Sequence, residues 1–388
     1  MFNNTPFESI LKVIPRGLFD TAVKDSDANR YDKKFKSYDH LIALIFGQLS
    51  GAKSLRELET SFNSNSSSHY HLGTQAIKRS TLADANKRRD PAAFKAVAEQ
   101  LMKQISKSQR RNLQPMLSLL DSTPIQLKSR GHQWAKANAT NHQTGLKIHA
   151  VINGIAHTPS YINITNPNVN DVSDALNMPI EKDTIYVFDK GYCSYTLWHR
   201  IECAQSHFVT RFKRTAAVDV IENKAVTKKE IISDEIVTFR YKSNRAKHTN
   251  PYYGNKLRRV TVKRDGKQPI VLVTNLLNAS ASEIAALYKK RWDIELFFKW
   301  IKQNLKIKRF LGESKNAVIL QIYAAIITYL LVWIYKKSQG VKTTLHLLLI
   351  QLKSTLFQRD SGIYQRKRRR HRQAKALIME EKQHAMRF

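Results

Sequence analysis

The sequence predicts an α/β protein in which a mixed sheet is flanked by helices, interrupted by a β-rich insertion and preceded by a helical region. Three observations predict this architecture. Residues 1 to about 108 carry helix-capping signals, the segment from about residue 115 consists of short β-branched and aromatic runs, and helical periodicity returns after residue 280. The chain has 388 residues, 42% of them hydrophobic, which is enough for a substantial core spread over two or three domains.

The N-terminal region reads as several short helices. Thr5-Pro6-Phe7-Glu8 combines an N-cap, a proline at the first helical position and a capping-box glutamate, and a second helix is predicted over residues 37–49. Such helices suit a helix-turn-helix-like DNA-binding module spanning residues 1–108. The candidate recognition segment is 79–89, and a generic basic helix is the open alternative for it. The side chains expected to contact DNA are Arg79, Asn86, Lys87 and Arg88.

Strand-like runs follow, separated by turn signals. Helical pattern appears between the last two of them, so a meander followed by alternating strands and helices is expected. The next segment, about 213–275, reads as a β-rich insertion with a basic face, and Asp265-Gly266 is a strong hairpin signal within it. The runs before the insertion cover residues 116–121, 146–152, 158–164, 184–189 and 207–212.

The C-terminal third is predicted to be helical. One long helix is expected from a capping box at Ser280 to about Lys306, and another over 343–357. Between them, residues 317–335 are 19 residues without a charge, for which a buried core helix is favoured over a membrane span. The predicted domains are therefore 1–108, 109–340 with the insertion, and a basic C-terminal segment 341–388 that contains the RKRRRHR run at 366–372.

The charge balance points to a polyanionic partner. The chain carries 65 Lys and Arg against 31 Asp and Glu, a net charge of +34. Its two cysteines cannot form a disulfide framework, and the N-terminal residues do not read as a secretory signal. Secreted and disulfide-stapled classes are excluded, and a reduced, cytoplasmic compartment is expected.

Three carboxylates form the candidate catalytic constellation. Asp121 and Asp189 each follow an apolar run directly, so both are expected at strand ends, where a rigid element can preorganise a metal site. Glu295 lies on the long predicted helix, and Tyr288, Arg291 and Lys302 share its face because they are spaced by 3, 4 and 7 residues. An Arg-Glu-Lys salt-bridge ladder would produce the same spacing, although the many apolar residues around Glu295 favour a partly buried helix.

This constellation resembles that of DDE-type transposases of bacterial insertion sequences, in particular the insertion-sequence-four group with its Tyr-x2-Arg-x3-Glu-x6-Lys signature. The signature reads Tyr288 to Lys302 here, and the aspartates stand in DSTP and FDKGY. The resemblance implies an RNase H-like catalytic domain in which Asp121, Asp189 and Glu295 are catalytic and metal-binding, with Tyr288, Arg291 and Lys302 contacting DNA. It also implies cleavage at insertion-sequence ends followed by strand transfer into target DNA.

Two divalent ions, Mg²⁺ or Mn²⁺, are the expected cofactors, because phosphodiester cleavage needs an activated water and charge stabilisation, and hard cations prefer carboxylate ligands. The expected partners are double-stranded DNA, as terminal repeats and target, and a second copy of the chain in the DNA complex, with no membrane; the expected location is the bacterial cytoplasm at the nucleoid. A metal-dependent nuclease without strand transfer remains an alternative. So does a non-catalytic DNA-binding protein or inactive relative that occupies transposon ends, although a pure binder gains nothing from three carboxylates.

Overall fold

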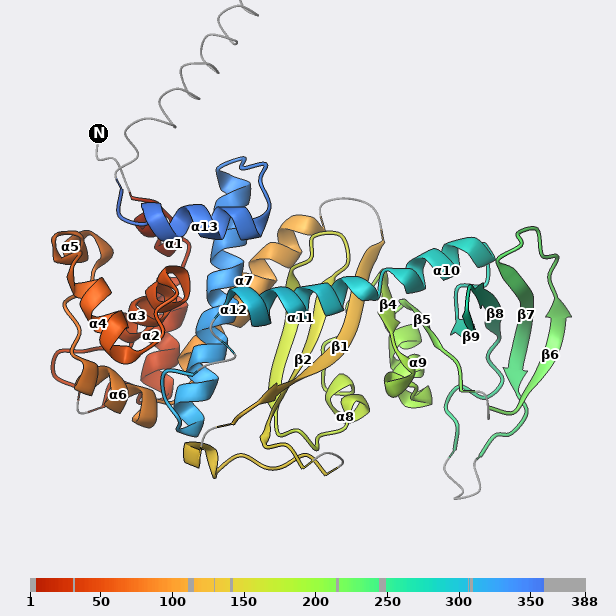
Figure 1. Ribbon diagram of the computed structural model, residues 1–388. Coiled ribbons are helices and arrows are strands. Elements are labelled where there is room, and N and C mark those ends of the chain that lie inside the picture. The colour runs from red at the N-terminus through yellow and green to blue at the C-terminus, as the bar shows by residue number, and fades with distance from the viewer. Residues whose placement is uncertain are drawn as a thin grey trace, which may run out of the picture.

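A single nine-stranded sheet runs through the computed structural model, in the order β3-β2-β1-β4-β5-β9-β8-β7-β6 (Figure 1). The structure describes residues 5–30, 32–110, 115–128, 130–139, 142–213, 216–243, 249–305, 307 and 310–358. The basic run at 366–372 lies outside these residues. The strands are β1 Met116–Gln126, β2 Gly145–Asn153, β3 Pro159–Thr165, β4 Thr184–Phe188, β5 His207–Arg211, β6 Val218–Asn223, β7 Ile231–Phe239, β8 Leu257–Arg264 and β9 Lys267–Thr274.

The first five strands form a mixed sheet. β1, β2 and β3 pair antiparallel as a meander, whereas β4 and β5 continue the sheet on the other side of β1 as parallel strands. The helix α9 (Tyr195–Cys203) connects β4 to β5. The predicted mixed sheet with covering helices is therefore confirmed, and its strand order fits an RNase H-like fold.

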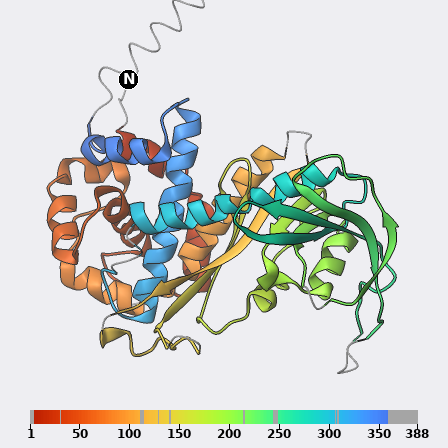
Figure 2. The same cartoon turned by 45° about the vertical axis from the view of Figure 1, so that its right-hand side comes forward.

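The strands between residues 218 and 274 extend this sheet rather than forming a separate one. β9 pairs antiparallel with β5, and β8, β7 and β6 follow outward (Figure 2). The turn at Asp265-Gly266 joins β8 to β9, and Gly266 has a φ of +63°, a conformation that favours glycine. After β9 the chain returns to the first part of the sheet at α10 (Ala281–Lys289), which packs against β4 and β5.

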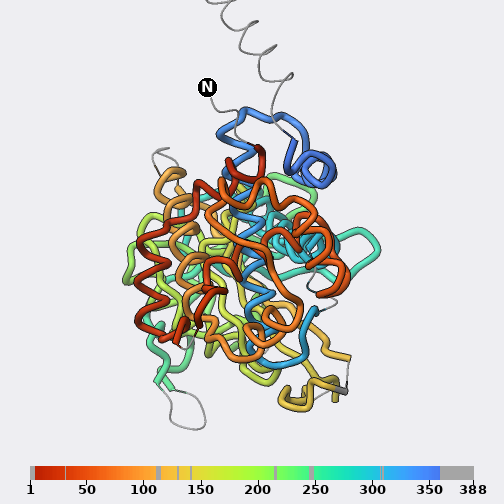
Figure 3. The backbone as a smooth tube through the Cα atoms, turned by 90° about the vertical axis from the view of Figure 1, so that its left-hand side faces the viewer, coloured from red at the N-terminus to blue at the C-terminus, as the bar shows by residue number. Residues whose placement is uncertain are grey.

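The helices gather around one buried helix, α12 (Lys315–Ser338). It packs against α3, α6, α7 and α13, and it stands between the N-terminal helices and the sheet (Figures 1 and 3). Among the described residues, α12 alone is long and apolar enough to span a membrane, yet 83% of its most apolar window is buried, as predicted for a core helix. The other helices are α1 Pro6–Leu11, α2 Arg16–Asp25, α3 Ser37–Ser50, α4 Leu55–Asn63, α5 His69–Leu72, α6 Arg79–Arg88, α7 Ala92–Gln109, α8 Asp171–Ala175, α11 Trp292–Asn304 and α13 Leu345–Thr355.

The packing of α12 crosses the domain boundary predicted at residue 108. One continuous hydrophobic cluster includes Phe7 and Leu41 from the N-terminal helices, Leu119 from β1 and Leu330 from α12. α7 also packs directly on β3. The N-terminal helices thus bury their apolar faces partly against an element that lies more than 200 residues later in the chain, and the DNA-binding role predicted for them is best tested in the full chain.

His40 in α3 couples the stability of this helical core to pH. The ring is completely buried, with Nε2 2.8 Å from Asn86 Oδ1, and burial together with the charge of Arg89 lowers its pKa from 6.5 to about 3. The unfolded chain therefore binds the proton more tightly than the folded one. Stability is complete above about pH 6.5 and is lost as the pH falls toward 3.

We expect the free energy of unfolding to fall by about 2 kcal/mol between pH 7.5 and pH 5 because of His40. The loss accumulates over the roughly 1.5 pH units below the unfolded pKa, at about 1.4 kcal/mol for each unit. Urea unfolding at the two pH values measures this difference. The His40→Gln protein should show a difference smaller by about that amount, and an unchanged difference would contradict the assignment.

Candidate active site

Asp121 and Asp189 lie at the same level of neighbouring strands. The parallel register of β1 and β4 ends at Leu119 opposite Val187, so the aspartates two residues further on face each other where the two strands diverge. Asp189 follows β4 directly, as predicted. For Asp121 the expected strand end is wrong: β1 continues to Gln126, because it keeps its antiparallel pairing with β2 after its pairing with β4 has stopped.

The predicted long helix is two helices. α10 ends at Lys289 and α11 begins at Trp292, while Lys290 and Arg291 keep helical dihedral angles. The backbone hydrogen bonds tighten to three-residue spacing here, from Arg291 N–H to the Tyr288 carbonyl and from Ile294 N–H to the Arg291 carbonyl. A short 3₁₀-like turn of this kind often marks a functional site. α11 then passes across β1 (Figure 1) and carries Glu295 and Lys302.

Tyr288, Arg291 and Lys302 form hydrogen bonds with the three carboxylates or with a residue close to them on β1. The Tyr288 hydroxyl donates to Asp189 Oδ1 at 3.0 Å. Arg291 bridges the other two carboxylates, with Nη1 3.4 Å from Asp121 Oδ2 and Nη2 2.7 Å from Glu295 Oε1. Lys302 Nζ donates to Thr123 Oγ1 at 2.6 Å. The structure therefore brings together all six residues that the sequence placed in the catalytic constellation.

The environment of the two aspartates differs. Burial raises the pKa of Asp121 to about 6, against the lowering effects of the Ser122 N–H and the Arg291 charge. Burial acts in the same direction on Asp189, but the Lys190 N–H, the Tyr288 hydroxyl and the charges of Arg291 and Arg211 together outweigh it and leave the pKa of Asp189 below its ordinary value. Burial and the neighbouring Asp189 raise the pKa of Tyr288, so its hydroxyl remains a donor at neutral pH.

Three carboxylates of this kind are the oxygen donors that hard divalent cations prefer, so the donor set fits such ions. Within the described residues, however, no three His, Cys, Asp or Glu side chains lie close enough together to hold one ion. The guanidinium of Arg291 bonds to both Asp121 and Glu295, and it is only 13% exposed. The cation in this position neutralises carboxylates that would otherwise repel one another.

A shallow pocket of about 440 Å³ opens beside these groups, and its lining includes Asp121, Thr123, Glu295 and Lys302. Beside it, Asp171 accepts a hydrogen bond from the Ser122 hydroxyl at 2.7 Å and pairs with Lys147 at 3.3 Å. Asp171 was not predicted from the sequence, because nothing in its local pattern distinguishes it from a helix-capping residue.

Two apolar side chains on α11 face solvent. Trp292 is 60% exposed and Leu296 is 58% exposed, whereas Ile294, Phe297 and Phe298 are buried. The expectation that apolar residues around Glu295 indicate a partly buried helix therefore holds for one face of α11 and not for the other. Exposed aromatic and aliphatic groups beside the carboxylates offer stacking surfaces to a nucleic acid.

The candidate recognition segment is a helix, α6, but only part of it is accessible. Arg79, Lys87 and Arg88 are exposed, and Arg88 pairs with Asp84. Asn86 is 3% exposed and its amide oxygen bonds to His40. The prediction that Asn86 reads base edges is therefore corrected, because its polar group is already used inside the core.

Comparison with known proteins agrees with this geometry. A family model described as Transposase DDE domain matches residues 112–331, and one described as Domain of unknown function (DUF4372) matches residues 2–75. A Sinorhizobium fredii protein described as transposase y4zB is 43% identical over 64% of this chain and 69% of its own length. A Synechocystis transposase for insertion sequence element IS4SA is 27% identical over 71% of this chain and 77% of its own length.

Among solved structures, the chain is similar to a piggyBac transposase synaptic complex with hairpin DNA, with a TM-score of 0.49, 10% identity, and coverage of 94% of this chain and 81% of that one. The DDE-domain match alone covers more than half of the 388 residues. The chain therefore belongs to the transposase DDE domain family, and it is an enzyme that cleaves DNA and transfers its strands.

Proposed function

We propose that Asp121, Asp189 and Glu295 are the catalytic carboxylates of this transposase. The observation that carries the proposal is their convergence from three separate elements, β1, the end of β4 and α11, with one arginine bonded to two of them. Convergent half-buried carboxylates repel one another and cost stability, so their position is explained by chemistry rather than by packing.

The three carboxylates would hold two divalent ions, Mg²⁺ or Mn²⁺. When bound, such ions supply a water nucleophile at neutral pH and stabilise the charge that develops on the phosphate. The chain itself positions the DNA strand. Tyr288 orients the Asp189 carboxylate by donating to one of its oxygens, and Lys302 reaches the β1 face two residues beyond Asp121.

Arg291 is proposed to exchange partners when the site is loaded. Without ions and DNA it neutralises Asp121 and Glu295. Once cations take over the carboxylates, its guanidinium is free to grip phosphate oxygens with two parallel hydrogen bonds. The same side chain thus stabilises the resting site and contributes a cation to the DNA-bound site.

The Tyr288-Arg291-Glu295-Lys302 arrangement supports placement in the insertion-sequence-four group. The proposed substrates are the terminal repeats of an insertion sequence and a target duplex, to which the net charge of +34 lends affinity. The proposed complex contains two copies of the chain, and the proposed location is the cytoplasm, at the nucleoid. Residues 1–108 are proposed to recognise the ends and 341–388 to add basic contacts.

The function is tested by incubating purified protein with Mg²⁺, a duplex that carries the element's own ends, and a target plasmid. Cleaved ends together with joined products support transposition. Cleavage without joining supports the nuclease alternative, and end binding without either product supports the non-catalytic one.

For end recognition, we expect the Arg79→Ala, Lys87→Ala double variant of the full chain to lose at least about tenfold in affinity for a terminal-repeat duplex, because each contact to a base or phosphate is worth roughly 1–3 kcal/mol. Titrations at several salt concentrations, with a scrambled duplex as reference, measure this loss. Asn86→Ala is the contrasting variant: it should lower stability, because it leaves buried His40 unpaired, and should spare affinity. Unchanged discrimination in the double variant would move end recognition away from α6.

A further inference from the structure

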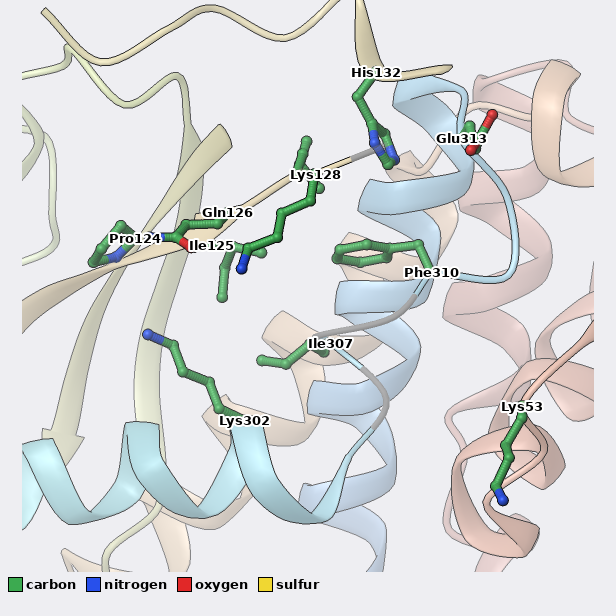
Figure 4. Close-up of a pocket in the computed structure, with 11 residues that line it drawn as sticks. Lys53, Pro124, Ile125, Gln126, Lys128, His132, Lys302, Ile307, Phe310 and Glu313 are labelled. Carbon is green, nitrogen blue, oxygen red and sulfur yellow. The ribbon is translucent and has the colours of Figure 1, made fainter. Parts of the chain in front are cut away.

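The two faces of β1 have different neighbours at the catalytic site. Successive side chains of a strand point to opposite faces, so Asp121 and Thr123 share one face and Ser122 lies on the other. The first face is covered by α11. Arg291, at the start of this helix, bonds to Asp121. Lys302 extends from the same helix toward β1 and bonds to Thr123 (Figure 4). The Ser122 hydroxyl is therefore on the face away from α11.

A further carboxylate lies on that second face. Asp171, the first residue of α8, accepts a hydrogen bond from the Ser122 hydroxyl at Oδ1 over 2.7 Å. Two side chains of β2 flank the same oxygen, with Lys147 Nζ at 3.3 Å and His149 Nδ1 at 3.5 Å. In addition, α8 packs against the turn 190–192, which directly follows the second catalytic aspartate. Asp171 thus lies where β1, β2 and the turn after β4 come together.

Ser122 connects Asp171 to the catalytic carboxylate. The Ser122 backbone N–H donates to Asp121 Oδ1 at 2.8 Å, and Arg291 Nη1 lies 3.4 Å from Asp121 Oδ2. These two contacts hold the Asp121 carboxylate in one orientation. Once cations release Arg291 from Asp121, as proposed above, only the Ser122 N–H remains of the two. The orientation of Asp121 in the loaded site then depends on how firmly Ser122 itself is held.

The bond from Ser122 to Asp171 is suited to hold that residue. A hydrogen bond to a charged acceptor is roughly twice as strong as one between neutral groups, and Lys147 offsets the charge of Asp171. Metal-ligating carboxylates are commonly held by hydrogen bonds of their own, and the loss of such an outer partner typically costs about 10–100-fold in metal affinity or activity.

We propose that Asp171 is a positioning residue of this transposase. By accepting the Ser122 hydroxyl on the face of β1 away from α11, it holds the Ser122 N–H against Asp121 and so sets the orientation in which that carboxylate binds a divalent ion. Asp171 acts through Ser122 and contacts neither the ion nor the DNA. The inference rests on the proposed function, since it takes Asp121 as an ion ligand.

The test compares Asp171→Ala, Asp171→Asn and Ser122→Ala in the full-length protein bound to a terminal-repeat duplex. Mn²⁺ binding is measured by electron paramagnetic resonance, with the Asp121→Asn complex as the background for ions held elsewhere. Cleavage of the pre-bound ends is measured over a range of Mg²⁺ concentrations. The first readout does not depend on catalysis, and the second separates weaker ion binding from a slower chemical step.

We expect Asp171→Ala and Ser122→Ala to raise the half-saturating concentrations of both ions about tenfold. At saturating Mg²⁺ their cleavage rates should return to within about threefold of the wild type, because the reacting groups are all present. Asp171→Asn keeps an oxygen that can accept the Ser122 hydroxyl, so its half-saturating concentrations should stay within about twofold of the wild-type values.

A double variant separates positioning from direct participation. Once the Ser122 hydroxyl is gone, Asp171→Ala has no further effect on Asp121, so the protein with both substitutions should be no worse than the poorer single variant. Asp174→Asn is the matched control in the same short helix. Asp174 is buried and accepts hydrogen bonds from Asn163 and Tyr161 of β3, so stability lost in this variant should leave Mn²⁺ binding and the Mg²⁺ dependence at wild-type values.

Three results would overturn the proposal. Wild-type ion binding in Asp171→Ala would make Asp171 a residue of local packing only. An Asp171→Asn protein as impaired as Asp171→Ala, or effects that multiply in the double variant, would show that the charge of Asp171 acts directly on the ion or the DNA. None of these results bears on the proposed catalytic carboxylates, which would instead be refuted by normal Mn²⁺ binding and cleavage in Asp121→Asn.

Discussion

The Glu295→Gln protein is expected to bind DNA ends with near-normal affinity and to cleave them at least about 10³-fold more slowly. Replacing a carboxylate oxygen by an amide removes a ligand for divalent ions, and with it several kcal/mol of transition-state stabilisation. Affinity is retained because it comes mainly from the positive surface of a chain with a net charge of +34. Gel-shift titrations and single-turnover cleavage of pre-bound ends measure the two quantities separately.

Asp121→Asn and Asp189→Asn should behave in the same way. Asp293→Asn is the matched control, because Asp293 lies on α11 two residues before Glu295 and on nearly the opposite side of the helix. A wild-type cleavage rate in the Glu295→Gln protein would remove this residue from the site. A large loss of cleavage in the Asp293→Asn protein would show that the side of α11 that faces the DNA has been misassigned.

Much of the catalytic sheet could be predicted because each strand is a short apolar run bounded by turn residues. The length of β1 could not be predicted from its apolar run, which stops at Asp121. Residues 122–126, of which three are polar, remain in the strand because β2 pairs with them along the whole length. Pro124 is tolerated there because β4 has already diverged and no hydrogen bond from its nitrogen is needed on that side.

The break between α10 and α11 has no local signal either. Lys290 and Arg291 are neither glycine nor proline, and both keep helical angles. The sequence could place Tyr288, Arg291 and Glu295 together because the intervening turn tightens without reversing the chain. It could not show that Arg291 bridges two carboxylates, since that contact depends on Asp121, 170 residues earlier.

Packing by distant parts of the chain determines which of the predicted DNA-contacting side chains are accessible. Asn86 looks like a base-reading residue beside Lys87 and Arg88, yet His40, 46 residues away, takes its amide oxygen. Trp292 and Leu296 look like core residues and are exposed. Local sequence describes which side chains are polar or apolar, whereas their availability is determined by which elements pack against them.

Arg291→Ala is expected to lower both stability and the cleavage rate, and Mg²⁺ should restore part of the stability but not the rate. Without Mg²⁺ the variant leaves Asp121 and Glu295 facing each other, part-buried and unpaired, and should lose about 1–3 kcal/mol of the free energy of unfolding. Mg²⁺ that binds only the folded state should recover part of this loss. Cleavage should remain slower by about 10²–10³-fold at saturating Mg²⁺, because a cation near the transferring phosphate is missing.

The Lys302→Ala variant separates the stabilisation of the metal-free site from the binding of phosphate. Lys302 donates to the Thr123 hydroxyl, whereas Arg291 bonds to two carboxylates, so the Lys302→Ala protein should lose less stability than Arg291→Ala, and its melting temperature should respond less to Mg²⁺. Cleavage or joining should still fall by about 10²-fold, because a point charge along the strand is removed. Arg291→Lys is the conservative comparison: it keeps the charge, loses the two-pronged grip and should lie between wild type and Arg291→Ala.

The alternative is a helix-stabilising ladder in which Arg291, Glu295 and Lys302 serve α11 only. Pairs of that kind on a helix surface contribute about 0.3–0.5 kcal/mol each and leave chemistry unchanged. The 2.7 Å contact from Arg291 to Glu295 is compatible with a ladder, but the 3.4 Å contact to Asp121 on β1 is not part of one. Wild-type cleavage rates on pre-bound ends in both alanine variants, with small Mg²⁺-independent stability losses, would leave the ladder as the explanation and remove the phosphate-binding role.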